Sequence, residues 1–383
     1  MSRPTPTAVL FGRKLPVTPR VLRGIGVLVA LVIAIVMPLV SKDLPPPLDG
    51  IFSPNLISNA MVFVLLALGL NIVVGFAGLL DLGYAAFFAI GAYGYAELAS
   101  AHYNIHVTFL VLLVFSAFLA AGFGVILGAP TLRLRGDYLA IVTLGFGEIV
   151  PRVFRNLESL TGGVNGLSGL DQPSIGPIHF GQIDATPYYF TILIVVAASV
   201  WLIRNLQVSR LGRAWQAIRE DELAAQAMGI NSVTTKLLAF GMGAAFSGFA
   251  GSFYASKLGL VSPEQFEFAV SVTILSMVVL GGMGNITGVI VGAFLIFYLE
   301  SYVLIQLPVW ATAIGGEGSP LASVDFTKYT FVILGVLLIS LMLLRPQGLI
   351  PSRLRRAELK EGGELGGMGP TPETVSPGGA DVQ

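Results

Sequence analysis

Long apolar stretches, separated by short polar connections, recur along almost the whole of this sequence. A helix needs about 20 apolar residues to cross the hydrocarbon core of a membrane. Ten stretches approach that length, and we predict that each forms a crossing helix. The sequence therefore predicts an all-α fold, a polytopic transmembrane helix bundle of about ten helices with broken or re-entrant segments. The ten stretches are residues 21–40, 55–74, 76–99, 107–127, 138–154, 187–203, 237–255, 269–280, 286–303 and 329–344.

Positively charged residues give the bundle an orientation, because cytoplasmic connections carry an excess of Lys and Arg. Basic residues gather in residues 1–20, in residues 204–236 and after residue 344. We therefore expect a multi-pass protein of the inner (cytoplasmic) membrane with both termini in the cytoplasm. The division is an N-terminal cytoplasmic segment at 1–20, a transmembrane domain at 21–350 and a cytoplasmic tail at 351–383. The tail is rich in Gly, Pro and Glu, and we predict that it is disordered.

Composition supports a membrane protein and excludes several kinds of chemistry. Hydrophobic residues make up 54% of the chain and charged residues 11%, against about 25% charged residues in a soluble domain. Cysteine is absent, which excludes disulfides, thiol catalysis and cysteine-ligated metals. His102 and His106 have an i, i+4 spacing without the Glu of a zinc motif, and His179 is isolated, so we predict no metal and no cofactor.

Two apolar stretches are interrupted in a similar way, by GFAGLLDLG at 75–83 and by GGMGNITG at 281–288. A broken helix leaves backbone groups unpaired, which lipid tolerates only where protein or water lines the break. The breaks are therefore candidates for a translocation path, and capped cytoplasmic turns are the alternative. Glu148 is predicted to be the deepest acidic residue, in a contact between helices or paired with Arg152, and proton coupling is a further alternative. The candidate path residues are Gly75, Gly78, Asp81, Glu148, Gly281, Gly282 and Asn285.

One helix of the bundle carries a stripe of small residues. Ala244, Gly248, Ser252 and Ser256 repeat every four residues, which keeps them close to one face of a helix. We predict that this stripe allows close helix packing, as small residues do in membranes.

The segment GRAWQAIREDELAAQAMGIN at 212–231 is too polar to cross a membrane. Trp215, Ile218 and Ala225 share a helical face, and Gly229 stands where a helix C-cap is expected. A surface helix on the membrane and a docking helix for a cytoplasmic partner both fit this pattern. No Gly-x-x-x-x-Gly-Lys-Ser/Thr loop occurs in the chain, so transport that uses ATP requires another subunit to bind it.

Several long motifs closely resemble the membrane permease subunits of branched-chain amino acid ABC importers. They are LALGLNIVVGFAGLLDLGYAAFFAIGAY at 66–93, LRLRGDYLAIVTLGFGEIV at 132–150, LTGGVNGLSG at 160–169, the segment 212–231, MVVLGGMGNITGVIVGA at 277–293 and RPQGLI at 345–350. The resemblance covers roughly residues 55–350. It implies a transport subunit rather than an enzyme, which moves branched-chain amino acids across the membrane. The implied partners are a homologous second permease, two ATP-binding subunits and an extracytoplasmic substrate-binding protein, with membrane lipid around them and no nucleic acid.

The resemblance also implies a role for the polar segment. Ala224, Ala225 and Gly229 are similar to the Glu-Ala-Ala-x-x-x-Gly coupling motif of importers, although Leu223 precedes the alanines and Glu222 is displaced by one position. Tyr84 stands where many relatives have His. The candidate ATPase-coupling residues are Gly212, Arg213, Arg219, Glu222, Ala224, Ala225 and Gly229.

Two alternatives to this function remain open at the level of sequence. The same permease family is similar to importers of urea and short amides. A proton-coupled secondary transporter would instead need no ATPase and would depend on Asp81 or Glu148.

Overall fold

The computed structural model describes residues 7–10, 13–16, 35–38, 48–99, 108–131, 137–175, 178–181, 185–315, 325–345 and 347–350. Helices dominate these ranges, and the prediction of an all-α fold is confirmed. Most of the predicted N-terminal segment and first crossing helix, His102, His106 and the predicted tail lie outside the described residues. The strands form three short antiparallel pairs: β1 (Thr7–Leu10) with β2 (Arg13–Pro16), β3 (Leu167–Ser168) with β6 (Leu260–Val261), and β4 (Ser174–Ile175) with β5 (Ile178–His179).

Seven helical stretches among the described residues are long and apolar enough to cross a membrane. They correspond to seven of the ten stretches that the sequence marks, and four of them combine a longer helix with adjacent short helices that the sequence does not separate. The seven are Asp49–Phe76, Phe109–Thr131, Thr186–Val208, Ser232–Leu258, Pro263–Gly281, Ile286–Ala313 and Phe326–Leu344.

Two of the other predicted stretches are helical but differ from an ordinary crossing helix. Helix α4 (Tyr84–Leu98) begins at Tyr84 rather than at residue 76, because residues 77–83 leave the helical conformation. Helix α6 (Asp137–Asn156) is 20 residues long, but it carries Glu148, Arg152 and Arg155 within its C-terminal half. Its charge explains why it is not counted among the apolar helices.

The centre of the bundle consists of α3 (Pro54–Leu70), its π-helical continuation η2 (Asn71–Phe76), α4, α5 (Phe109–Thr131) and α11 (Ser232–Leu258). Helix α11 packs against α3, α4 and α5. A Cβ atom at Gly248 would lie 2.5 Å from Ser116 O, and one at Gly91 would lie 2.4 Å from Gly248 Cα. Ala244, Gly248, Ser252 and Ser256 are all buried. The predicted packing role of this stripe is confirmed, because the backbones approach too closely for larger residues.

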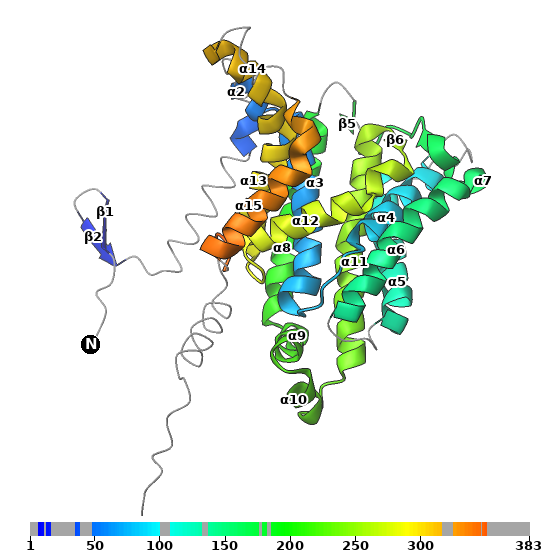
Figure 1. Ribbon diagram of the computed structural model, residues 1–383, viewed down its shortest axis with the longest axis vertical. Helices are drawn as coiled ribbons and strands as arrows, with labels where there is room; N and C mark the ends of the chain where they lie inside the picture. Colours follow the sequence, from blue (N-terminus) through cyan, green and yellow to red (C-terminus); the bar gives the residue numbers. More distant parts are fainter. Residues whose placement is uncertain are drawn as a thin grey trace, which may run out of the picture.

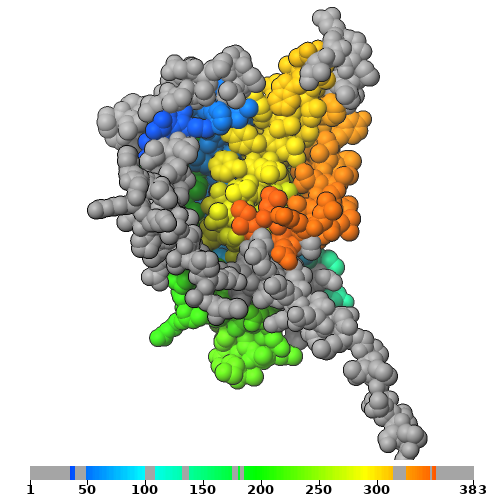
Figure 2. All heavy atoms as spheres, turned by 90° about the vertical axis from the view of Figure 1, so that its left-hand side faces the viewer, coloured from blue at the N-terminus to red at the C-terminus, as the bar shows by residue number. Residues whose placement is uncertain are grey.

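The C-terminal part of the bundle forms a second group of helices. Helix α12 (Phe268–Gly281) is extended at its start by the 3₁₀ turn η4 (Pro263–Phe266), which explains why residues 269–280 look short for a crossing helix. Helix α12 packs against α13 and α3. In Figure 2 the yellow and orange helices form one continuous face above the green α9–α10 region. The remaining elements are α13 (Ile286–Tyr298), η5 (Leu299–Val303), α14 (Leu304–Gly315), η6 (Phe326–Tyr329) and α15 (Thr330–Leu344).

The short elements gather at the two ends of the bundle (Figure 1). Helix α8 (Thr186–Val208) leads to α9 (Arg210–Glu220) and α10 (Glu222–Ala227), which project from the lower end. The upper end carries α7 (Glu158–Thr161), η3 (Gly163–Asn165) and strands β5 and β6. Helix α2 (Leu48–Ile51) also lies there. The bundle therefore has one end built around α9–α10 and an opposite end built from loops.

Candidate functional site

The predicted docking segment forms two helices rather than one, α9 and α10. Asp221 breaks the chain between them: its backbone is extended, and its Oδ1 accepts hydrogen bonds from Leu223 N at 2.8 Å and Ala224 N at 3.0 Å. The expectation of a single helix is wrong because Asp is a strong N-cap residue. Gly229 follows α10 with φ +87°, and Ile230 N donates to Ala225 O at 3.0 Å. The predicted C-cap role of Gly229 is thereby confirmed.

The apolar face that the sequence identifies in this segment is buried against the protein. Trp215 is fully buried, and Ile218 and Ala225 are also buried. The Trp215 indole donates a hydrogen bond from Nε1 to Thr235 O at 2.7 Å. This bond fixes α9 to the first turns of α11, a contact between two elements that the sequence pattern does not identify. Gly212 is buried as well, and a Cβ there would lie 2.3 Å from Leu206 O.

An ion pair ties α10 to α11. Lys236 Nζ lies 2.6 Å from Glu222 Oε1, and the two side chains are only 5% and 25% exposed. Gln226 Nε2 also donates to Ser232 Oγ at 2.8 Å. The sequence reasoning missed Lys236, and its only signal is a lysine that falls at the start of an apolar stretch. Because both partners are largely shielded from water, removing one of them leaves the other charge without its partner and costs more than breaking an exposed surface pair.

The tip of the segment presents exposed apolar side chains. Leu223 is 62% exposed and Met228 is 85% exposed, and Ala224 and Gly229 are exposed between them. Arg213 is exposed too, although its Nη1 donates to Val208 O at 2.7 Å. Exposed Leu and Met side chains on a short, well-anchored helix are typical of a protein docking surface.

Arg219 connects this segment to the first break. Its guanidinium donates a hydrogen bond from Nη1 to Gly75 O. A Cβ atom at Gly78, which has φ +70°, would lie 2.7 Å from Arg219 Cγ. Gly75 and Gly78, predicted as path residues, are therefore in direct contact with a predicted coupling residue.

The second break joins the same cluster. Gly284 N donates to Asn71 Oδ1 at 2.8 Å, which links the 281–288 segment to η2. Asn285 caps α13 by accepting from Thr287 N at 3.1 Å, and its Nδ2 donates to Ile350 O at 2.8 Å. Gly281 and Gly282 pack against the 347–350 segment, where Ile350 N donates to Gly281 O at 3.1 Å. The structure thus places both breaks together, with the polar cap that the alternative interpretation describes.

The end of the first break is buried against α6 and α11. Asp81 is 1% exposed, and its Oδ1 accepts from Gly83 N at 2.9 Å. Leu82 N donates to Thr143 Oγ1 at 3.0 Å, so the loop is bound to α6. The Tyr84 hydroxyl donates to Gly243 O at 2.8 Å, which gives this residue a contact between helices.

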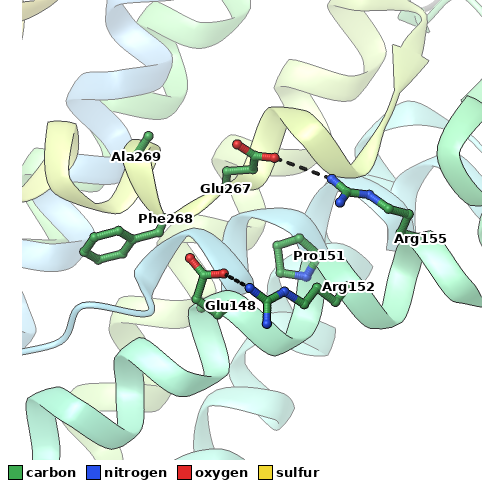
Figure 3. A pocket seen from close by; sticks show the side chains of 8 residues that line it. Glu148, Pro151, Arg152, Arg155, Glu267, Phe268 and Ala269 are labelled. Atoms are coloured by element: carbon green, nitrogen blue, oxygen red, sulfur yellow. Dashed lines mark hydrogen bonds and ion pairs between the residues drawn. The ribbon is translucent and has the colours of Figure 1, made fainter. Parts of the chain in front are cut away.

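Glu148 is less deeply placed than we expect from sequence. Its side chain is 41% exposed, and its Oε2 lies 2.9 Å from Arg152 Nη2, which confirms the i, i+4 pairing. A second pair, Arg155 Nη2 and Glu267 Oε1 at 3.4 Å, joins α6 to the start of α12. Figure 3 shows these two pairs beside each other at the edge of a hollow of about 330 Å³. The sequence reasoning missed Arg155 and Glu267, because their proximity depends on tertiary packing.

Comparison with known proteins relates this arrangement to a family. Residues 54–342 match the family model described as the permease component of branched-chain amino acid transport systems. The chain belongs to this family. It is a multi-pass membrane protein and a transport subunit rather than an enzyme.

Individual relatives agree with this membership. The high-affinity branched-chain amino acid transport system permease protein LivM of Escherichia coli K12 is 40% identical over 327 residues, covering 80% of this chain and 72% of the relative. The probable LivM of Methanocaldococcus jannaschii is 26% identical, covering 63% and 69%. The autoinducer 2 import permease LsrC of Yersinia pseudotuberculosis is 26% identical, covering 66% and 70%. No solved structure matches the chain.

Proposed function

We propose that this chain is a permease subunit that moves branched-chain amino acids across the cytoplasmic membrane as part of an ATP-driven importer. The observation that carries the proposal is the 40% identity to LivM over 80% of the chain. By comparison, the identity to an autoinducer 2 import permease is only 26%, over 66% of the chain. The seven apolar helices found among the described residues supply the membrane body that such a subunit requires.

ATP hydrolysis takes place on partner subunits in this proposal. The chain contains no Gly-Lys pair and hence no phosphate-binding loop. The exposed tip of α10, with Leu223 and Met228, is the surface that docks an ATP-binding subunit. A homologous second permease, two ATP-binding subunits and an extracytoplasmic binding protein complete the importer.

The contacts of α9 supply a mechanical connection for coupling. A movement of α10 reaches α11 through Lys236 and Glu222, and it reaches η2 through Arg219 and Gly75. The break at 77–83 then connects to α6 through Leu82 and Thr143. Docking at one end of the molecule can therefore shift helices that face the path. The α9–α10 end is cytoplasmic in this arrangement, which agrees with the Lys and Arg content of residues 204–236.

Reconstituted transport tests the proposal. The chain is assembled in proteoliposomes with its second permease and two ATP-binding subunits, and the loaded binding protein is added outside. We expect uptake of leucine, isoleucine or valine that requires hydrolysable ATP inside and does not respond to an imposed proton gradient. Uptake of urea or short amides in their place would contradict the proposed substrate. Uptake driven by a proton gradient without the ATP-binding subunits would contradict the proposed energy source.

A further inference from the structure

Helix α6 has a charged face that the rest of the described chain leaves open. Glu148, Arg152 and Arg155 have the spacing i, i+4, i+7, which places them on one side of the helix. Their side chains are 41%, 68% and 38% exposed. Helix α6 is long enough to cross the membrane, and exposed charges on such a helix are costly against lipid. This face must therefore meet water or another protein.

The charged face borders a hollow that contains both signs of charge. Glu267, at the start of α12, lies across the hollow from α6 and pairs with Arg155 at 3.4 Å. Two guanidinium groups and two carboxylates thus surround a space of about 330 Å³ (Figure 3). The rest of the lining is small or apolar: Gly147, Pro151, Phe268 and Ala269.

These groups match the chemistry of an α-amino acid. A guanidinium group binds a carboxylate through two parallel hydrogen bonds, and carboxylates accept from an ammonium group. An uncharged apolar wall suits an aliphatic side chain, and the volume is at the lower end of the range for small-ligand pockets. The four charges of the lining sum to zero, and a zwitterion is also neutral overall, so the occupied hollow carries no net charge. A neutral amide carries neither a carboxylate nor an ammonium group, so it forms weaker hydrogen bonds with these charged groups than a zwitterion does.

One of the two ion pairs lies within a single helix, and the other joins two helices. The Glu148–Arg152 pair lies within α6 at 2.9 Å, so the helix itself keeps its partners together. The Arg155–Glu267 pair is longer and joins α6 to the start of α12. A zwitterion can take the place of this contact, because its carboxylate pairs with Arg155 and its ammonium group pairs with Glu267.

We propose that the hollow between α6 and the start of α12 is a zwitterion-binding subsite on the path of the amino acid. Arg152 and Arg155 bind the carboxylate, and Glu148 and Glu267 bind the ammonium group. This inference rests on the proposed function of the chain.

The position of α6 connects this subsite to the coupling end. Thr143 of α6 accepts from Leu82 N, and a Cβ at Gly147 would lie 3.0 Å from Gly83 Cα. The same loop begins next to Gly78, which contacts Arg219 of α9. A shift of α9 therefore changes the packing of α6 and with it the spacing of the charged groups in the hollow.

The test uses the complete importer in proteoliposomes with loaded binding protein and ATP. In Arg152→Gln and Glu267→Gln we expect uptake of leucine to fall about tenfold, which corresponds to about 1.4 kcal/mol of lost interaction. Stimulation of ATPase activity by the binding protein should stay within about twofold of wild type, since the docking surfaces are intact. Lys328→Gln is the matched control, because it removes the exposed Asp325–Lys328 pair away from the hollow and should leave uptake unchanged.

A charge-swapped variant separates binding from structural support. Glu148→Arg combined with Arg152→Glu keeps an ion pair at the same positions but reverses its direction, so uptake should stay low. Recovery of uptake in the swapped variant would overturn the proposal, because the pair would then act only as a structural contact. Normal uptake in both single variants would overturn it as well.

The concentration of binding protein that gives half-maximal ATPase stimulation provides a separate readout. A large increase in that concentration in the single variants would assign this face to binding-protein docking and would also overturn the proposal. A wild-type importer that moves no branched-chain amino acid would contradict the proposed function instead. The single variants decide the question alone if the swapped chain inserts poorly, as measured by its abundance in the membrane.

Discussion

Replacing Gly229 by Val tests whether the α10 tip transmits the action of ATP. Gly229 has φ +87°, and no atom lies within 4 Å of the position that a Cβ would take. A side chain therefore meets no clash, and the whole effect comes from the backbone. Left-handed backbone disfavours a non-glycine residue by about 1–2 kcal/mol, and β-branching adds to this. An energy of that size changes the population of the native turn by roughly 5- to 30-fold.

The expected result is specific to coupling. Helix α10 is only six residues long, so the strain is relieved by redirecting the chain between Met228 and Asn231. We expect Gly229→Val to reach the membrane at normal abundance, to co-purify with less of the ATP-binding subunits and to lose most ATP-driven uptake. Gly229→Asn should keep most of the activity, because Asn tolerates the left-handed region.

The chain supplies a matched control for backbone strain. Gly169 also has positive φ, +70°, and also has no atom within 4 Å of its Cβ position, but it lies near the opposite end of the bundle. Gly169→Val should leave co-purification of the ATP-binding subunits unchanged. Normal co-purification and normal uptake in Gly229→Val would refute the reasoning and reduce α10 to a surface helix.

Three further predictions concern the same region and the orientation of the chain. Lys236→Met should weaken the attachment of α10 by about 2 kcal/mol, since it removes a hydrogen bond between charged, shielded groups. Faster hydrogen exchange of the α10 amides would reveal this loss, and unchanged exchange would contradict the role of the pair. Arg219→Ala should reduce uptake more than ATP hydrolysis, because it breaks the contact with Gly75 and leaves the exposed tip of α10 intact. Equal loss of both activities would argue against a coupling contact. Reporters fused after residue 20, within 204–236 and after residue 356 should be cytoplasmic, and one within 160–169 should be external; an external reporter after residue 356 would contradict the orientation.

The sequence predicts the helices well where a single physical rule governs them. Seven of the ten stretches marked by apolar length are long apolar helices among the described residues, and a four-residue repeat of small side chains predicts the packing of α11. The same rules do less well where a local polar residue competes. Asp221 caps a new helix inside a segment that has one apolar face, and the loop at 77–83 shortens α4.

The site is harder to predict because its contacts join distant parts of the chain. Gly75 and Arg219 are 144 positions apart, and Asn71 and Gly284 are 213 apart. The periodicity of residues within one helix cannot predict a contact between such distant positions. The Glu148–Arg152 pair was accessible from sequence because both residues lie on one helix, whereas Arg155 and Glu267 meet only after α6 and α12 have packed.

The contact between Arg219 and the first break has a consequence for the synthesis of the protein. Gly75 leaves the ribosome 144 residues before the arginine that covers its carbonyl oxygen. At the usual elongation rate of about 5–20 residues per second, that interval lasts roughly 7–30 s. During this time the nascent first break lacks its native guanidinium partner. The earliest helices therefore enter the membrane while the Gly75 carbonyl lacks this hydrogen-bond donor. Water or the insertion machinery must solvate the first break until α9 has been made.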